Sequence, residues 1–542
     1  MKRFTAFATA LILIAGVMSG CNSDKAADKK DKKEEVKQVL NLTATSEIPS
    51  MDSTLATDNV SFLVMDNTME GLYRLDKNNK PTEGIAKSYE VSEDKKKYTF
   101  HLRDAKWSNG DPVTAHDFVF AWQRAVNPKT AAEYAFILFD IKNAAEVNSG
   151  KVPVDQLGVK ALDDKTLEVE LVNAVPYFLE LTTFGTYYPL NEKFVTAQGS
   201  KHGVEADSVL YNGPFVLKEW KHEESFKLAK NPNYWDKDTV KLEEINFAIV
   251  KDVATAVNLY DTDQVDRIVL NAEFVDKYKD NKEFGTLLDS RLFFIRYNQK
   301  NKLFANQKVR KAIDLAYNKE DIADVILNDG SQPAYSLVPK NFVKGPDGKD
   351  FRDINGDLNK GSVDEAKKLW AEAKKELGIT TIEVEMLNYD SDSAKRIGEF
   401  IKEELEKNLE GLKVNIKQQP FAQKLDLEKN LDYEFSFSGW GPDYPDPMTF
   451  VDMFITDSDF NEMAYSNKKY DELVAKAKGE LLVDPQARWN AMAEAEKILF
   501  EDMAISPVYQ RGIAFVQKEY VRDVHKHNFG GDYSFKWAYI EK

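Results

Sequence analysis

A single cysteine limits how this chain of 542 residues can be held together. Cys21 has no second thiol to pair with, so no disulfide can form within the chain. Stability must instead come from the burial of apolar side chains, and 43% of the residues are hydrophobic. The roughly 500 residues that follow position 40 exceed what one hydrophobic core usually contains. We therefore predict a body of two or three lobes.

The residues before Cys21 have the pattern of a signal peptide. Two basic residues precede an apolar run over 4–17, which is too short to span a bilayer. The next stretch, 18–21, reads Met-Ser-Gly-Cys and resembles a bacterial lipoprotein processing site. We predict a signal peptide over 1–20 and a lipid on Cys21. The alternative is an ordinary secreted protein with one thiol near its cleavage point.

The segment 21–39 is predicted to be a flexible tether. It is rich in Lys, Asp, Glu and Ala and contains no aromatic side chain. Such a segment has little apolar surface to bury, so burial cannot offset the conformational entropy that it would lose on folding. A lipid on Cys21 would then hold the body at the extracellular face of the cell membrane.

The body itself is acidic. The formal net charge of the chain is -17, which repels polyanions, so we expect no nucleic acid partner. After Cys21 the sequence has no apolar run of about 18 residues, and no membrane-spanning helix is predicted there.

Periodicity in the body predicts a mixed α/β fold. The alternating sequence Tyr-Thr-Phe-His-Leu predicts a strand, and Asn109-Gly110 predicts the turn after it. Thr114 and Asp117 have the spacing of a capping box, which predicts a helix that ends before Pro128. Further helices are predicted at 309–317, 363–377, 394–409 and 486–500, and further strands at 381–387 and 434–438.

Motifs of catalysis and metal binding are missing from the sequence. It contains no GxSxG, Walker loop, GxGxxG or HExxH motif. We interpret His525 and His527 as a surface-exposed pair, and 353–357 as a turn, because a calcium loop would need a Glu at its twelfth position. No cofactor, metal or enzymatic activity is expected. An extracellular hydrolase stays a weaker alternative, because 90 acidic residues always supply carboxylate pairs.

Three stretches together resemble one protein family. They are 98–134, centred on Trp-Ser-Asn-Gly-Asp-Pro-Val-Thr-Ala-His-Asp-Phe; 212–215 with 231–235; and 439–447, Gly-Trp-Gly-Pro-Asp-Tyr-Pro-Asp-Pro. In this order they resemble the oligopeptide- and dipeptide-permease type of solute-binding proteins of ABC importers, family 5 of the extracellular solute-binding proteins. The resemblance runs from residue 40 to the C-terminus.

The resemblance implies a periplasmic-binding-protein-like α/β fold, with two hinged lobes and an accessory third lobe. Lobe I is expected to be discontinuous and to comprise 40–69, 192–296 and 510–542. The accessory lobe II is expected over 70–191, and lobe III over 297–509.

The resemblance also implies a ligand site on the loop 439–447. In the family, the aspartate of a Trp-x-x-Asp-Tyr loop binds the N-terminal ammonium of a peptide, and that position here is Asp443. A buried carboxylate suits the task, because an ammonium that leaves water needs an opposite charge. Gly439 and Gly441 flank Trp440 and are expected to let a peptide backbone approach. The alternative is a surface turn in which Trp440 fills the core.

Contacts on the other side of the peptide are implied by the same resemblance. It places Thr57, Asp58 and Asn59 against the peptide backbone, and Tyr134 and Tyr509 along the groove. Each tyrosine could equally be an ordinary core aromatic.

Other positions are interpreted differently. Asn212 and Gly213 are expected to be structural residues on the hinge side. Family members that select a peptide length use a basic residue for the C-terminal carboxylate, whereas Glu428, Phe437 and Ala394 stand at the candidate positions here. The length preference is therefore not carried over.

The function implied is that of a lipid-anchored, monomeric oligopeptide-binding protein that delivers peptides to the membrane permease subunits of an ABC importer. The open alternative is a receptor for a signalling peptide or a cell-wall peptide, because it would use the same fold and the same Asp443.

Overall fold

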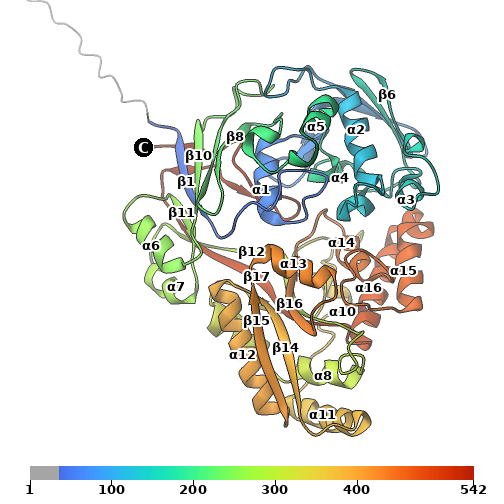
Figure 1. The fold of residues 1–542 in the computed structure, drawn as a ribbon, viewed down its shortest axis with the longest axis vertical. Helices are drawn as coiled ribbons and strands as arrows, with labels where there is room; N and C mark the ends of the chain where they lie inside the picture. The colour runs from blue at the N-terminus through green and yellow to red at the C-terminus, as the bar shows by residue number, and fades with distance from the viewer. Residues whose placement is uncertain (1–35) are drawn as a thin grey trace, which may run out of the picture. The chain divides into compact units, whose positions relative to one another are not determined.

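A mixed sheet of eleven strands runs through the described part of the chain, residues 36–542 of the computed structural model (Figure 1). Its strand order is β15-β14-β16-β12-β17-β11-β1-β10-β9-β8, and β13 pairs with β17. The strands are β1 (Val39–Ala44), β8 (Phe215–Lys221), β9 (Ser225–Lys230), β10 (Glu244–Ile249), β11 (Arg267–Val269), β12 (Phe284–Tyr297), β13 (Gln332–Pro333), β14 (Ile382–Tyr389), β15 (Leu412–Gln419), β16 (Phe435–Trp440) and β17 (Ile505–Gln517).

The predicted leader concerns residues that precede the described part of the chain. The predicted signal peptide 1–20, Cys21 and nearly all of the predicted tether lie outside the described residues. None of the helices within 36–542 combines the length and the apolar content of a membrane span.

Two long strands, β12 and β17, join the two ends of the sheet. They pair antiparallel, and their register breaks between Leu288 and Leu292, where residues 289–291 lie opposite Arg511 alone. Extra residues of this kind bend a strand. β17 pairs with β11 on one side of the break, and β12 pairs with β16 on the other. The bulge therefore lies where the chain passes from one half of the sheet to the other.

Helices pack beside the β14–β16 half of the sheet, where α12 lies along β14 and β15 (Figure 1). They are α8 (Gln307–Leu315), α11 (Val363–Leu377), α12 (Asp392–Asn408) and α13 (Phe421–Lys429). The core between them contains Ile313, Trp370, Ile401 and Phe435, all nearly inaccessible to solvent. These large apolar side chains hold the half of the sheet that ends in the loop 439–447.

A second sheet belongs to the segment that the sequence assigns to lobe II. Its order is β4-β5-β7-β6, from β4 (Ala86–Val91), β5 (Lys97–Leu102), β6 (Val159–Asp163) and β7 (Thr166–Glu170). Beside it, α2 (Ala115–Val126) begins at the predicted capping box, in which the Asp117 carboxylate accepts the Thr114 N–H at 2.8 Å. The predicted strand and helix of this stretch are thus confirmed. The lobe boundaries stay predictions.

The other helix and strand predictions are also confirmed, with small shifts at their ends. The predicted segments form α8, α11, α12, α16 (Pro485–Glu501), β14 and β16. α11 shows why these patterns were readable: the Ser362 hydroxyl accepts the Glu365 N–H at its start, and Gly378 ends it with φ 66°.

Two interpretations were wrong. His527 is not on the surface: only 5% of it is exposed, its Nδ1 lies 3.0 Å from Asn79 Oδ1, and burial lowers its pKa to about 3. The cause is that β19 (His525–Lys526) pairs with β20 (Tyr533–Ser534) and packs on an earlier part of the chain. The stretch around 353–357 is not a bare turn but contains the short helix α10 (Arg352–Asn355).

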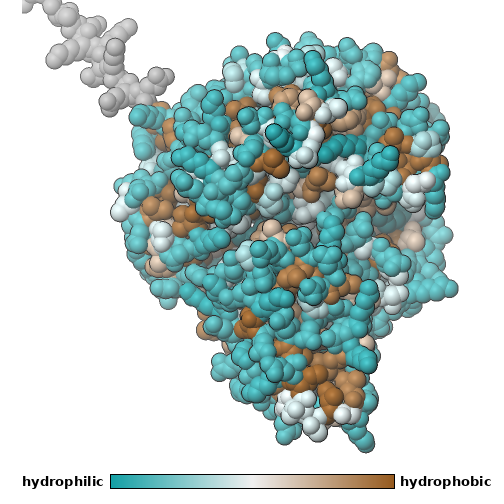
Figure 2. Space-filling view, viewed as in Figure 1, coloured by the Kyte–Doolittle hydropathy of each residue, from teal (hydrophilic) through white to brown (hydrophobic). Residues whose placement is uncertain are grey.

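Hydrophilic side chains cover most of the face seen in Figure 2, and apolar side chains gather there in small, separate areas. This distribution agrees with the acidic composition of the chain.

Candidate functional site

Asp443 is a buried carboxylate at the end of strand β16. It lies in the loop between β16 and α14 (Met448–Val451), and only 6% of the residue is exposed. Its Oδ1 accepts a hydrogen bond from the Tyr134 hydroxyl at 3.2 Å, and its N–H donates to Thr449 Oγ1 at 3.0 Å. Within residues 36–542, no Lys, Arg or His forms an ion pair with it. Its charge therefore lacks a cationic partner in the described chain.

The surroundings of Asp443 disfavour its charged form. Burial raises its pKa well above the usual carboxyl range, and the charge of Asp452 raises it further, whereas hydrogen bonds from Tyr134 and Thr449 lower it. An incoming cation would stabilise the ionised carboxylate. The geometry thus suits the binding of a positively charged group.

Tyr134 reaches Asp443 from a distant part of the sequence. It belongs to the 3₁₀ helix η1 (Glu133–Leu138), and its ring contacts Phe62, Phe184 and Phe460 at centroid distances of 5.7, 5.1 and 5.1 Å. These rings fix its position. The structure therefore brings together two of the predicted site residues, Tyr134 and Asp443.

The segment 297–509, which contains the loop 439–447, makes further contacts with the segment 70–191. The Tyr444 ring stacks on the Tyr177 ring at 4.6 Å, and Lys429 pairs with Glu133 at 2.5 Å. Asn173 Nδ2 also donates to the Lys478 carbonyl at 3.3 Å. The site is thus closed by side chains from both segments.

Asp446, three residues after Asp443, has the opposite environment. Its carboxylate forms a two-fold ion pair with the Arg488 guanidinium, at 2.7 and 2.8 Å. The two carboxylates therefore have different roles: Asp446 is neutralised within the chain, whereas Asp443 is not.

Trp440 and the two glycines beside it support the loop. Trp440 is half-buried, and its Nε1 donates to the Thr449 carbonyl at 2.9 Å. A Cβ on Gly439 would lie 2.8 Å from the Phe293 ring, and one on Gly441 would lie 3.0 Å from Arg291 Nε. Side chains of β12 fill the space beside both glycines, and the approach of a peptide backbone to them stays a prediction.

Asp58 caps the helix α1 (Asn59–Thr68). Its carboxylate accepts the N–H groups of Val60 and Ser61, each at 2.9 Å, and the Ser61 hydroxyl at 2.6 Å. Thr57 is half-buried and Asn59 is exposed. In the described part of the chain, no hydrogen bond joins these three residues to Asp443, although Phe62 of α1 packs on Tyr134.

Tyr509 lies in strand β17. Its ring stacks on Phe293 at 4.9 Å and approaches Phe437 at 6.3 Å. It is buried in the same core as α8 and α11. This position fits the alternative interpretation of Tyr509 as a core aromatic.

Both parts of the second resembling stretch, 212–215 and 231–235, meet at Glu70, a buried residue that sequence reasoning missed. Glu70 Oε1 accepts from Arg74 at 2.8 Å and from the Tyr234 hydroxyl at 2.7 Å, while Trp235 donates to Oε2. The Asn212 side chain pairs with the N–H and C=O of Glu70 at 3.0 and 2.8 Å. Asn212 is thus structural, as expected, and nothing local in the sequence identified Glu70.

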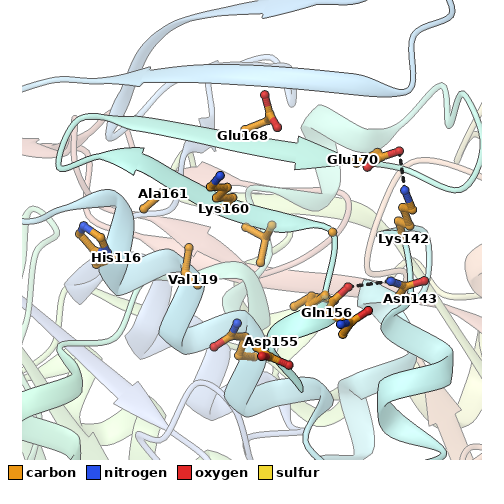
Figure 3. A pocket seen from close by; sticks show the side chains of 14 residues that line it. His116, Val119, Lys142, Asn143, Asp155, Gln156, Lys160, Ala161, Glu168 and Glu170 are labelled. Atoms are coloured by element: carbon orange, nitrogen blue, oxygen red, sulfur yellow. Dashed lines mark hydrogen bonds and ion pairs between the residues drawn. The ribbon is translucent and has the colours of Figure 1, made fainter. Parts of the chain in front are cut away.

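A hollow of about 540 Å³ lies elsewhere, between α2 and β6 (Figure 3). Lys142 and Glu170 pair across its rim at 2.9 Å, and Asn143 Nδ2 donates to the Gln156 carbonyl at 2.7 Å. These groups satisfy one another, in contrast to Asp443.

Known proteins of one family resemble this chain. The family model "Bacterial extracellular solute-binding proteins, family 5 Middle" matches residues 80–462. The dipeptide-binding protein DppE of Bacillus subtilis is 36% identical over 99% of both chains.

Two solved structures resemble the whole body. The substrate-binding domain of an oligopeptide ABC transporter from Bacillus anthracis is 55% identical, with a TM-score of 0.92 over 94% of this chain and 99% of that one. The pheromone receptor PrgZ, whose structure was described together with its mode of peptide binding, is 38% identical. Its TM-score is 0.89, and the match covers 94% of this chain and 100% of that one. They confirm the expected periplasmic-binding-protein-like α/β fold, and the chain belongs to the bacterial extracellular solute-binding proteins of family 5.

Proposed function

We propose that this chain is an extracellular, lipid-anchored oligopeptide-binding protein that delivers peptides to the permease subunits of an ABC importer. The observation that carries the proposal is Asp443, a buried carboxylate without a cationic partner in residues 36–542. The names of the relatives, a dipeptide-binding protein and the substrate-binding domain of an oligopeptide transporter, support the same class of ligand.

The N-terminal ammonium of a peptide is the cation that Asp443 is proposed to bind. Every unblocked peptide has this group whatever its sequence, so a site that reads it accepts many peptides. Tyr134 donates a neutral hydrogen bond to the carboxylate, and Thr449 accepts the backbone N–H of Asp443, so neither residue cancels the charge. The proposed activity is binding and release by a monomer, with no catalytic step.

Bound ligand should be found on the purified protein. Denaturation should release a mixture of peptides with free N-termini, identified by mass spectrometry.

After the ligand is stripped, adding peptide at 100 times its Kd should stabilise the fold by about 2.7 kcal/mol, because only the folded form binds. Solution scattering should also show a smaller radius, since the contacts of Tyr134 and Tyr444 close the site. The absence of both released peptide and a shift in Tm would contradict the proposal. Cleavage of added peptides would favour a hydrolase.

A signalling role is the second candidate. It is favoured by the similarity to the pheromone receptor PrgZ over 94% of this chain. The same experiment separates the two roles, because one dominant released peptide would favour a receptor and a broad mixture would favour nutrient uptake.

Anchoring is proposed from the sequence around Cys21. Cys21→Ser should move the protein from the membrane fraction into the medium or leave it unprocessed, because the lipid has no other attachment site. Ser23→Ala is the control and should stay with the membrane. A Cys21→Ser protein that has lost residues 1–20 and still partitions with membranes would contradict the lipid anchor.

A further inference from the structure

We propose that Arg488 is a positioning residue for Asp443, and that it thereby sets the preference for a free N-terminal amine. The inference rests on the proposed function, but it concerns a residue outside the loop, on the helix α16. Arg488 does not touch Asp443; it acts through Asp446.

Arg488 fixes the loop with the whole of its guanidinium group. Its two Nη atoms donate to the Asp446 carboxylate at 2.7 and 2.8 Å, and its Nε donates to the Ala477 carbonyl at 2.9 Å. Both side chains are nearly buried, with 3% and 8% exposed. Fork-to-fork pairs of this kind fix orientation as well as distance. The loop is therefore attached to a long, rigid helix.

Asp446 connects Arg488 to Asp443 through hydrogen bonds at the start of α14. Its Oδ1 also accepts the Met448 N–H at 2.9 Å, at the start of α14, and its own N–H donates to the Tyr444 carbonyl at 2.9 Å. α14 carries Thr449, whose Oγ1 accepts the Asp443 N–H at 3.0 Å. Hydrogen bonds and the peptide bond between Met448 and Thr449 thus connect the guanidinium to the residue that carries the unpaired carboxylate.

The loop depends on this attachment because it has few backbone donors of its own. Pro442, Pro445 and Pro447 lack an N–H group, so backbone hydrogen bonds cannot hold the loop as they hold a helix or a strand. Proline limits each φ angle but does not set where the loop lies relative to α16. The ion pair supplies that placement.

The alternative is that the pair only stabilises the fold, and the chain offers a matched control. Glu496 lies on the same helix and forms a two-fold pair with Arg352 at 2.7 and 3.0 Å. Glu496 is fully buried, but it accepts the N–H groups of Leu337 and Val338, in a different loop. Weakening this pair should cost stability without moving Asp443.

The test compares Arg488→Lys with Arg352→Lys. Calorimetry on ligand-stripped protein, well below the Tm, would give the ratio of Kd values for an N-acetylated peptide and its free-amine form. We expect this ratio to fall about tenfold in Arg488→Lys, because lysine cannot form the two-fold pair. In Arg352→Lys the Tm should fall similarly and the ratio should stay at the wild-type value.

Each other outcome overturns the inference. If both variants keep the wild-type ratio, the Arg488 pair is merely structural; if both lose it equally, the loss reflects general loosening. If the unmutated protein binds the acetylated and free-amine peptides with equal Kd values, the ammonium site is wrong as well. This result would mark a failure of the proposed function, whereas the two results above would mark a failure of this inference alone. Asp446→Asn, which keeps one acceptor oxygen for the guanidinium, replaces Arg488→Lys if that variant does not fold.

Discussion

Asp443→Asn should weaken the binding of free-amine peptides by about 30-fold to several-thousand-fold. Loss of one member of a buried charge pair typically costs about 2–5 kcal/mol, because the remaining charge is left unpaired in a dry site. Asparagine keeps the shape of the side chain and the hydrogen bond from Tyr134, so the change removes mainly the charge. Titration calorimetry on ligand-stripped protein measures the loss.

Acetylation of the peptide N-terminus identifies the group that Asp443 binds. In the unmutated protein it should cost about as much as Asp443→Asn, because it removes the partner charge. In Asp443→Asn it should cost little more, because both changes remove one interaction. Amidation of the peptide C-terminus should have a smaller effect.

The control for this experiment is Asp457→Asn. Asp457 is exposed and has φ 60°, a conformation that asparagine tolerates. Asp446 is unsuitable as a control, because changing it alters the pair with Arg488 that is proposed to position Asp443. Equal affinities for free and acetylated peptides in the unmutated protein would eliminate Asp443 as the ammonium site.

The parts of the fold that local patterns determine were predictable. The capping box of Thr114 and Asp117 and the Ser362 and Gly378 ends of α11 act within a few residues, so their positions could be read directly. The mixed α/β class followed from the same elements.

The parts that depend on pairing between distant segments were not predictable from periodicity. The contact of Tyr134 with Asp443 joins residues 309 positions apart, and only the family resemblance suggested that both belong to one site. His527 was misassigned because its burial depends on the β19–β20 pairing of the C-terminal tail. The close packing of the loop glycines on Phe293 and Arg291 was not readable either, because these side chains come from β12.

The burial of charged side chains was the hardest feature to predict from the sequence. Lys424 and Glu428 lie on one helix, α13, where charged residues four apart usually form a solvated face. In the structure the pair is enclosed, with 0% and 3% of the two side chains exposed and 2.7 Å between Nζ and Oε1. Glu428, which stands where a basic residue was sought for a peptide carboxylate, is therefore neutralised within the chain.

Glu428→Leu should lower the free energy of unfolding by about 3–5 kcal/mol, because it leaves the Lys424 ammonium buried without its counter-ion. Tyr389 offers only its ring, whose centroid lies 4.1 Å from Lys424 Nζ, and Ser436 loses the carboxylate to which it donates at 2.7 Å. Urea unfolding of the two proteins measures the difference.

The double variant Lys424→Met/Glu428→Leu removes both charges. It separates the destabilisation caused by an unpaired buried ammonium from the net contribution of the ion pair to stability. It should recover most of the loss, because apolar side chains of similar size replace both ions. Glu494→Gln, in the exposed pair with Lys469, should cause no measurable change. A double variant as unstable as Glu428→Leu would mean that packing, and not the unpaired ammonium, causes the loss.

The pH dependence of Glu428→Leu gives an independent check on the same cause. Burial lowers the pKa of Lys424 to about 8 even with Glu428 nearby, and without this carboxylate the pKa should fall further. A Lys whose folded-state pKa is depressed contributes stability above its unfolded pKa and loses it as the pH falls through the folded value. The deficit of Glu428→Leu relative to the unmutated protein should therefore shrink as the pH rises toward about 8, the folded-state pKa of Lys424 in the unmutated protein, and stay constant above it, since a neutral amine is less costly to bury. A deficit independent of pH below this value would show that the Lys424 charge is not its source.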